Sequence, residues 1–344
     1  MPEVITIIGG GLAGLTLGIG LRQRGIPVVV WEAGQYPRHR VCGEFINGHG
    51  LATLERLGLR AGLQTAGARP AVTLALFSAK AGSPVRTLPE PSVGLSRYVL
   101  DACLAREFQT LGGELRPGMR WRGDCPEGTV RTNGRRLERS TGGWRMFGLK
   151  VHARGVALNA DLEMHFVPSG YVGLCRLAGG EVNICGLFRS SSTVPDLARS
   201  WRTWLGGPDD SVLHSRLAAA DLDESSFCSV AGLCLSPLRA ADPAECAVGD
   251  ALAMIPPFTG NGMSMAFESA ELAIEPLARF SCGELTWPEG RTAIANACEN
   301  RFTARLRYAT WLHHLLFNRP ARSALLFAAA RSDWLWRALF SSTR

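Results

Sequence analysis

Three glycines near the N-terminus have the spacing of a phosphate-binding turn. Gly9, Gly11 and Gly14 follow the apolar run 4–8, and a helical pattern extends from them to about Arg24. In such a turn Gly9 permits the tight bend, Gly11 lets a pyrophosphate approach the backbone, and Gly14 lets the helix pack against the strand. The N-terminus of the helix also offers unpaired N–H groups to an anion. We therefore expect a dinucleotide site formed by these glycines and by the first helical turn, which contains Leu12 and Ala13.

An acidic residue ends the next apolar run. The segment 28–31 has the pattern of a buried parallel strand, and Glu32 follows it directly, with Ala33 beside it. From this position a carboxylate can accept hydrogen bonds from both ribose hydroxyls of an adenosine, whereas it would repel a 2′-phosphate. The pattern thus favours FAD or NAD over NADP.

A second strand–loop–helix unit lies near the other end of the chain. The apolar run 246–248 leads into a Gly-Asp pair, and a helical pattern extends from Met263 to about Phe280. Prolines stiffen the loop, and glycines bring its backbone close to a flat or anionic group. An aspartate after a strand lies where α/β sheets bind ligands. The residues expected to bind a cofactor here are Gly249, Asp250, Pro257, Gly260, Asn261, Gly262 and Met263.

Two such units, far apart in the chain, fit the two ends of one long cofactor. In these motifs the chain resembles the FAD-dependent oxidoreductases grouped with para-hydroxybenzoate hydroxylase and geranylgeranyl reductase. The resemblance implies that the first motif binds the ADP half of FAD and that Asp250 binds its ribityl or phosphate side. It implies that the helix start near Gly262 faces the flavin, and that Arg97, in an Arg-x-x-Leu-Asp segment, reaches the FAD. NAD(P)H is then the expected transient electron donor.

The segment after the second predicted strand carries the candidate catalytic residue. Residues 40–44, Arg-Val-Cys-Gly-Glu, are similar to a segment of geranylgeranyl-reductase-like flavoproteins that passes beside the flavin, with a cysteine facing the substrate. Cys42 is therefore the candidate active-site thiol, with a pKa that Arg38 and Arg40 would lower and Glu44 would raise. The alternative is an inert, buried Cys42. Arg40 is alternatively expected to contact the FAD phosphates.

Three strand-like runs in the middle of the chain predict the wall of a substrate pocket. The runs 147–152, 171–177 and 181–187 are joined by glycine-containing turns, which indicates an antiparallel sheet. Their apolar character predicts an apolar pocket for an aromatic, polyketide-like or lipid substrate. The residues expected to line it are Cys42, Gly43, Glu44, Lys150, His152 and Tyr171, and a structural role for Lys150 and His152 remains the alternative.

Charge and cysteine usage exclude several other classes of protein. The chain has 344 residues and a net charge of +7, and residues 301–344 carry this whole excess, with eight arginines against Asp333. The neutral remainder argues against a nucleic-acid partner, and the ten cysteines lack a metal-binding spacing. A strand at the very start argues for a cytoplasmic protein without a signal peptide. The basic, tryptophan-containing tail is either a helical pair packed on the FAD-binding domain or a peripheral contact with the inner membrane face.

Two departures from the family patterns narrow the expected chemistry. The turn 132–136 carries Asn133 in place of the family's Asp, which favours reductases over aromatic hydroxylases. The chain also lacks the Trp-x-Trp-x-Ile-Pro motif, so a flavin halogenase is not expected.

The sequence therefore predicts an α/β fold in which a Rossmann-like FAD-binding domain of the glutathione-reductase type carries an inserted β-rich substrate domain. The expected division is 1–70, 93–145 and 236–300 for the FAD-binding domain, 71–92 and 146–235 for the substrate domain, and 301–344 for a basic helical tail. The leading hypothesis is an FAD-dependent monooxygenase acting on an apolar substrate. The alternatives are a reductase of isoprenoid double bonds and a non-catalytic flavin-binding protein at a membrane. The sequence does not indicate the oligomeric state.

Overall fold

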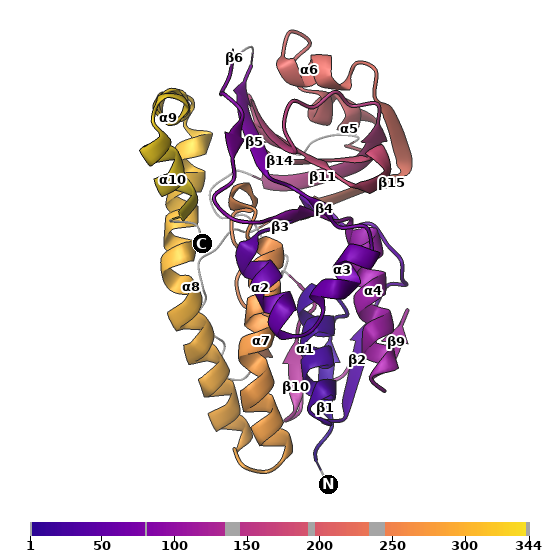
Figure 1. Cartoon of the computed structure of the whole chain (residues 1–344). Helices are drawn as coiled ribbons and strands as arrows, with labels where there is room; N and C mark the ends of the chain where they lie inside the picture. The colour runs from indigo at the N-terminus through magenta and orange to yellow at the C-terminus, as the bar shows by residue number, and fades with distance from the viewer. Residues whose placement is uncertain (1, 80, 135–144, 192–196, 234–244, 342–344) are drawn as a thin grey trace.

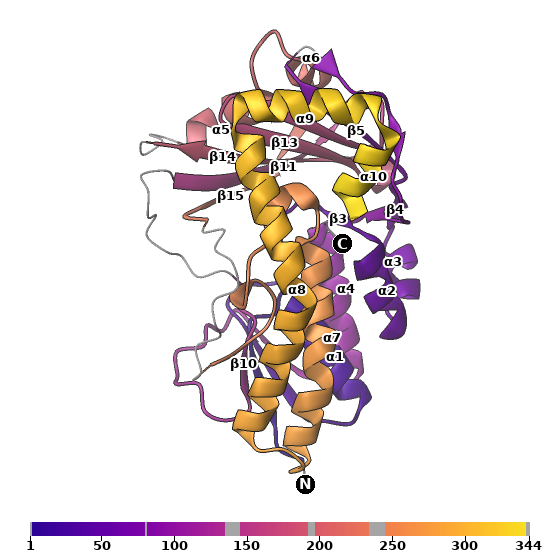
Figure 2. The same cartoon turned by 90° about the vertical axis from the view of Figure 1, so that its left-hand side faces the viewer.

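A computed structural model describes residues 2–79, 81–134, 145–191, 197–233 and 245–341 of the chain. A parallel sheet with its helices forms one end of the molecule and a larger, mostly antiparallel sheet forms the other (Figure 1). The C-terminal helices run along one side and contact both ends (Figure 2). The predicted fold class is confirmed.

The first sheet has five parallel strands in the order β16-β10-β1-β2-β9. The central strand β1 is apolar and almost fully buried, as expected for a strand with neighbours on both sides. All loops that bind ligands in such a sheet leave from the carboxyl edge, so the two glycine motifs leave from the same edge. The strands are β1 (Ile5–Ile8), β2 (Val28–Glu32), β9 (Glu114–Pro117), β10 (Thr129–Arg131) and β16 (Cys246–Ala247).

Helix α1 (Leu12–Gln23) lies between α7 (Gly262–Ser281) and α4 (Arg97–Thr110), and together they bury the main core (Figure 1). The helix ends as predicted, because Gly25 adopts a φ of +76°, which favours glycine. The short helices α2 (Gly48–Arg56) and α3 (Arg60–Thr65) complete this part of the fold.

The second sheet has eight strands in the order β15-β11-β14-β13-β12-β5-β6, with β7 paired to β5. The pairs that the sequence predicts are antiparallel, whereas β5 runs parallel to β12. Helices α5 and α6 cover one face, and the other face turns toward the flavin-binding half of the molecule. The elements are β5 (Thr73–Ser78), β6 (Ala81–Gly82), β7 (Arg86–Thr87), β11 (Arg145–Arg154), β12 (Leu162–Val167), β13 (Gly170–Arg176), β14 (Val182–Ser190), β15 (Asp221–Ala231), α5 (Leu197–Gly206) and α6 (Val212–Leu217).

A small sheet in the order β3-β8-β4 joins the two halves. Its strands are β3 (Phe45–Ile46), β4 (Arg69–Pro70) and β8 (Val93–Gly94), and three short 3-10 turns are η1 (Ala178–Gly180), η2 (Gly249–Ala251) and η3 (Pro257–Thr259). The predicted domain boundary at 235–236 and the predicted turn residues 135–136 lie outside the described residues. The division into two domains remains a proposal.

The C-terminal part of the described chain consists of three helices. Helix α8 (Trp287–Phe317) runs without a break through residue 301, and α9 (Arg319–Arg331) and α10 (Asp333–Ser341) follow it. Arg305 of α8 is buried, and its guanidinium pairs with Glu268 of α7 at 2.7 Å. Within the described ranges, no helix is long and apolar enough to cross a membrane.

The pair between Glu268 and Arg305 fixes α8 to α7. Burial opposes ionisation of Glu268, but hydrogen bonds and charge from Arg305 and Arg301 hold its pKa below the usual value. Replacing Arg305 by alanine should lower the free energy of unfolding by about 3 kcal/mol, because it leaves a buried carboxylate with only the half-exposed Arg301. Urea denaturation measures the loss. The control Arg24→Ala removes an exposed pair with Glu275 and should cost less than about 1 kcal/mol. Equal, small losses would show that the buried pair does not hold the two helices together.

Candidate functional site

The N-terminal turn has the geometry that its three glycines predict. Gly9 adopts a φ of +114°, and a side chain there would overlap the backbone of Asn133. A side chain at Gly14 would overlap the carbonyl oxygen of Gly9, so the helix can approach the strand only without one. At Gly11, in contrast, an added Cβ would meet no atom within 4 Å. This open space at a helix N-terminus fits a pyrophosphate.

The two glycine motifs meet at the carboxyl edge of the parallel sheet. Gly249 adopts a φ of +67°, and a Cβ there would lie 2.7 Å from Cβ of Ala13 in the first turn of α1. Asp250 follows in η2 and is exposed at this edge. The structure thus brings segments from the two ends of the chain together, as one long cofactor requires.

The start of α7 is held in place by amide side chains. Asn47 donates from its side chain to the side-chain oxygen of Asn261 and accepts a hydrogen bond of 2.6 Å from Ser264. Both asparagines are buried. Gly260 adopts a φ of +66° and approaches the ring of Phe45, while a Cβ at Gly262 would meet no atom within 4 Å. Leu12 and Met263, in contrast, are core side chains and can serve a cofactor only through their backbone.

Glu32 lies at the end of β2, next to the turn. Its carboxylate accepts hydrogen bonds from the N–H of Gly10 at 2.9 Å and of Gly34 at 2.7 Å, and it pairs with Arg38 at 2.6 Å. Burial opposes ionisation, but Arg38 and the Gly34 N–H outweigh it and lower the pKa of Glu32. The carboxylate is therefore charged and anchored, as a ribose acceptor must be.

The sequence analysis missed two neighbours of this turn. Tyr36 donates its hydroxyl to the carbonyl oxygen of Gly10, and the guanidinium of Arg38 lies over its ring at 4.9 Å. The type and position of Arg38, six residues after the acid, could have indicated a partner for Glu32. Arg40 lies 3.9 Å from Glu32 with its side chain half exposed, and Ala33 is exposed nearby. Both remain proposed contacts of the cofactor.

Arg97 does not extend into the open turn. Its guanidinium makes two hydrogen bonds, of 2.6 and 2.8 Å, to the buried carboxylate of Asp101 one helical turn later. It also lies beside the thiol of Cys42. In this arrangement Arg97 ties α4 to the segment that carries Cys42, and contact with FAD stays a prediction.

A buried polar cluster lies behind the segment 40–44. The carboxylate of Glu44 accepts a hydrogen bond of 2.9 Å from the N–H of Arg97, and its second oxygen lies 2.6 Å from Nε2 of His152. Lys150, fully buried on β11, lies 3.8 Å from Glu44 and 3.0 Å from Nδ1 of His39. Burial, together with the charges of Lys150 and His152, lowers the pKa of His39 to about 4. His39 is therefore neutral near pH 7, and its Nδ1 accepts a hydrogen bond from Lys150.

Glu44 itself has an unusual backbone. Its φ of +56° lies in the left-handed region, which a residue with a side chain adopts at a cost in energy. The hydrogen bonds of its carboxylate and the pairing of Leu95 N–H with its carbonyl oxygen at 2.9 Å hold it there. Strain of this kind, overdetermined by its surroundings, gathers at functional sites.

The expected activation of Cys42 is not found. Burial raises the pKa of the Cys42 thiol, and this outweighs the opposing effect of the nearby Arg97. Arg38, which was expected to lower that pKa, is paired with Glu32 instead. Cys42 is therefore a neutral thiol near pH 7 and not a thiolate nucleophile.

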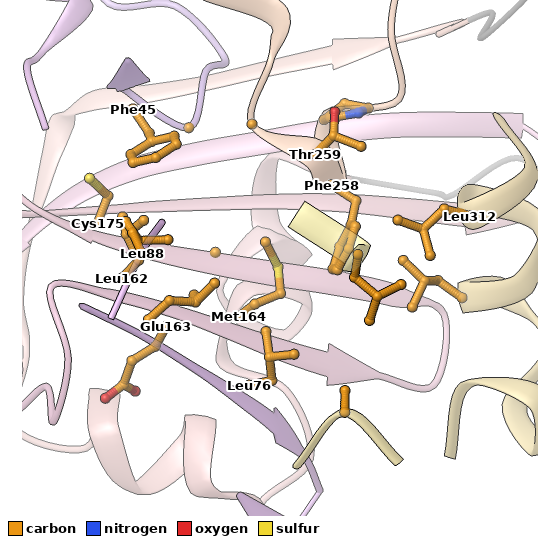
Figure 3. Close-up of a pocket in the computed structure, with 18 of the residues that line it drawn as sticks. Phe45, Leu76, Leu88, Leu162, Glu163, Met164, Cys175, Phe258, Thr259 and Leu312 are labelled. Atoms are coloured by element: carbon orange, nitrogen blue, oxygen red, sulfur yellow. The ribbon is translucent and has the colours of Figure 1, made fainter. Parts of the chain in front are cut away.

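A large apolar pocket lies between the second sheet, the two flavin-side loops and the C-terminal helices (Figure 3). Its empty space is about 1030 Å³, the part open to solvent included. Leucine is the commonest residue of the walls, which also include Met164, Phe258, Phe45 and Trp336. Glu163 also lies at the wall, but its carboxylate points away from the labelled apolar side chains and pairs with His165 and Arg216.

Only one of the predicted substrate residues lines this pocket. Gly43 does so, whereas Glu44, Lys150 and His152 form the buried cluster behind it. Tyr171 is buried nearby, with its ring 5.7 Å from that of Phe258, and Cys42 lies on the side of Arg97. The pocket wall that sequence reasoning missed includes Cys175, Met164 and the leucines of α8 to α10. Strand alternation could have placed Cys175 on the same face as Tyr171.

Comparisons with known proteins agree with this geometry. The FAD-binding domain family matches residues 2–139. The chain is 25% identical over 320 residues to a menaquinone reductase of Mycolicibacterium smegmatis, covering 79% of this chain and 75% of that protein. Its fold is similar to that of PqsL of Pseudomonas aeruginosa, described as a probable FAD-dependent monooxygenase, with a TM-score of 0.70, 16% identity, and 95% and 99% of the two chains covered. The halogenase PltM gives a TM-score of 0.76 at 14% identity, covering 97% of this chain and 79% of its own.

The converging glycine motifs and the matched domain define a flavoprotein whose cofactor is FAD. The chain carries an FAD-binding domain in residues 2–139 and is an FAD-dependent oxidoreductase, and the predicted resemblance to the para-hydroxybenzoate hydroxylase superfamily is confirmed. The non-catalytic alternative is therefore not retained.

Two glycine variants separate FAD binding from folding. Gly11→Val should leave the unfolding transition in place and abolish FAD retention, because the added side chain fills the open space at the helix N-terminus. Gly14→Val should instead destabilise the fold, because its Cβ overlaps the backbone at Gly9. Thermal unfolding of the apoprotein and flavin absorbance after gel filtration measure the two effects. Full FAD retention by Gly11→Val would place the pyrophosphate elsewhere.

Proposed function

We propose that the protein reduces a carbon–carbon double bond of a long, apolar, isoprenoid-type substrate. The observation that carries this proposal is the pocket, whose leucine-lined space reaches the loops at Gly43–Phe45 and Pro257–Gly260. The second of these loops leads into the helix start that the resemblance assigns to the flavin. A substrate in the pocket would therefore meet the reactive end of the cofactor.

The chemistry of the walls supports a lipid more than a polar aromatic acid. The wall has few polar side chains among its described residues: Glu163 pairs with His165 and Arg216, the Thr259 hydroxyl donates to the carbonyl oxygen of Pro256, and the Cys175 thiol lies near the carbonyl oxygen of Glu44. Leucine is the commonest residue of the wall. Burying about 25 cal/mol per Å² of apolar surface makes such a wall selective for hydrocarbon. The name of the curated relative, a menaquinone reductase, points to the same class of substrate.

Reduction of a double bond needs a hydride at one carbon and a proton at the other. FAD, reduced by NAD(P)H, supplies the hydride. Cys42 does not line the pocket but adjoins Gly43, which does, and its raised pKa keeps the thiol protonated near pH 7; we propose it as the proton donor. Arg97 beside it would stabilise the thiolate left after the transfer.

The buried cluster can return that proton. Glu44 contacts the loop of Cys42 and lies 2.6 Å from Nε2 of His152, whose Nδ1 lies 3.8 Å from the partly exposed carboxylate of Glu181. This series of groups leads from solvent to the back of the loop. Because Glu44 adjoins Gly43 of the pocket wall, this series of groups is placed to relay a proton to the edge of the pocket.

Monooxygenation is the second candidate. The observation in its favour is the same water-excluding wall, because oxygen transfer from a flavin also requires a dry site. Such a reaction would insert one oxygen atom from O₂ and release the other as water, with NAD(P)H as the reductant. The buried polar cluster is compatible with both reactions, whereas the two reactions give different products.

Product analysis separates the candidates. Purified protein with FAD and NAD(P)H, supplied anaerobically with an isoprenoid quinone in detergent, should yield a product whose isoprenoid chain has gained two hydrogens. Mass spectrometry detects this gain after the quinol ring has been reoxidised in air, so that reduction of the ring alone does not count. A product that gains one oxygen, formed only in air, would replace the reductase by the monooxygenase. Oxidation of NAD(P)H without either product, across lipid and aromatic substrates, would contradict both candidates.

A pocket variant belongs to the same experiment. Met164→Trp should fill the space and reduce turnover at least about tenfold, the cost of a poorly fitted bulky side chain, while FAD stays bound. Met119→Trp, at an exposed position of the other half, is the matched control and should turn over normally. Normal turnover by Met164→Trp would exclude this pocket as the substrate site.

A further inference from the structure

Each of the three C-terminal helices exposes an aromatic side chain together with an arginine. Helix α8 presents Trp311 and α9 presents Phe327, while Trp334 of α10 is the most exposed of the three; their exposed fractions are 53%, 61% and 77%. An exposed arginine lies three or four residues from each: Arg307 on α8, Arg331 on α9 and Arg337 on α10. The guanidinium of Arg331 lies 3.5 Å from the centre of the Phe327 ring.

The opposite faces of the same helices form part of the pocket wall. Leu312 and Leu316 of α8, Leu325 and Leu326 of α9, and Leu339 of α10 all line the pocket. The three helices lie together on one side of the molecule, the side that faces the viewer in Figure 2. One layer of helices therefore separates the apolar pocket from an outer surface of aromatic and basic residues.

Only some of the arginines in the C-terminal segment contribute their charge to this outer surface. Arg301 and Arg305 are used inside the fold by Glu268, and Arg322 is buried over the ring of Phe166. Arg301 stays half exposed beside Glu268, and the other exposed arginines of the described segment are Arg307, Arg319, Arg331 and Arg337. Asp333 is the only acidic residue of 301–341, and it pairs with Arg86.

We propose that the outer face of α8, α9 and α10 docks on an anionic phospholipid bilayer. Aromatic rings partition into the headgroup region, and arginines beside them pair with lipid phosphates while their stems cover apolar surface. The patch is positively charged, which makes it complementary to an anionic bilayer. The chain outside 301–344 has a net charge of zero. Docking would bring the pocket wall against the membrane that holds an apolar substrate.

This proposal rests on one part of the proposed function, namely that the substrate is a lipid. Vesicle binding needs no turnover, so its outcome is independent of the reaction. The experiment is flotation of the FAD-loaded full chain with vesicles of phosphatidylcholine alone and of phosphatidylcholine with one quarter phosphatidylglycerol. We expect binding to the anionic vesicles that weakens as salt is raised, and little binding to the neutral ones.

Two pairs of substitutions test the residues. Arg331→Gln with Arg337→Gln should lower the partition coefficient at least about tenfold, as expected for the loss of two basic residues near an anionic surface. Phe327→Ser with Trp334→Ser should lower it on neutral and anionic vesicles alike, because it removes the inserted rings. Met119→Ser with Arg120→Gln makes the same kinds of change at exposed positions elsewhere and should bind as the unaltered protein does.

Three outcomes would overturn the proposal. The first is the absence of binding to anionic vesicles, and the second is binding that the tail variants leave unchanged. The third is an oligomer, seen by sedimentation velocity, that dissociates in the tail variants and not in the control variant. The last result would assign the face to a second copy of the chain. Near-normal thermal unfolding of the variants keeps a loss of binding from being a loss of fold.

Discussion

The close approach of two glycine motifs from opposite ends of the chain is the constraint on which the rest of the structure depends. Gly249 stands against Ala13, and Gly20 of α1 lies against Ile274 of α7, so the two helices can pack only where side chains are missing. This contact sets the start of α7 beside the phosphate turn and fixes the loop 257–260 at the pocket. The buried pair of Glu268 and Arg305 joins α7 to α8. It thereby positions the part of the pocket wall that α8 forms.

The second sheet is divided into a polar and an apolar half on the face that meets the flavin-binding part. On β11 and β14 this face carries Lys150, His152 and Asn183, which contact the segment 39–44. On β12 and β5 it carries Leu162, Met164 and leucines that line the pocket. In the proposed reaction, the polar half would relay the proton and the apolar half would hold the substrate, with Gly43 between them. Burial also sets the protonation states beside the polar half, because it keeps the thiol of Cys42 protonated and the imidazole of His39 neutral.

Local patterns in the sequence predicted the elements better than they predicted the site. Glycine spacing and strand–helix alternation gave both motifs, because their chemistry is built into a few adjacent residues. The burial of Arg305 could not be predicted, because its partner, Glu268, lies on a different helix, and a helical period carries no information on that contact. Cys42 was expected to be activated because Arg38 is near it in sequence, whereas in the fold Arg38 serves Glu32. The pocket was missed in part because its wall combines strands, loops and α8 to α10, which only the tertiary structure brings together.

The central claim is that FAD bound by the two motifs presents its ring to the leucine-lined pocket. The most direct measurement is a difference absorption spectrum of the FAD-loaded protein during titration with a saturated long-chain isoprenoid analogue, under air and without reductant. We predict a saturable change in the flavin bands, because the ligand replaces water at the ring, and its loss in Met164→Trp. A ligand that binds, by equilibrium dialysis, and leaves the flavin spectrum unchanged would contradict the account.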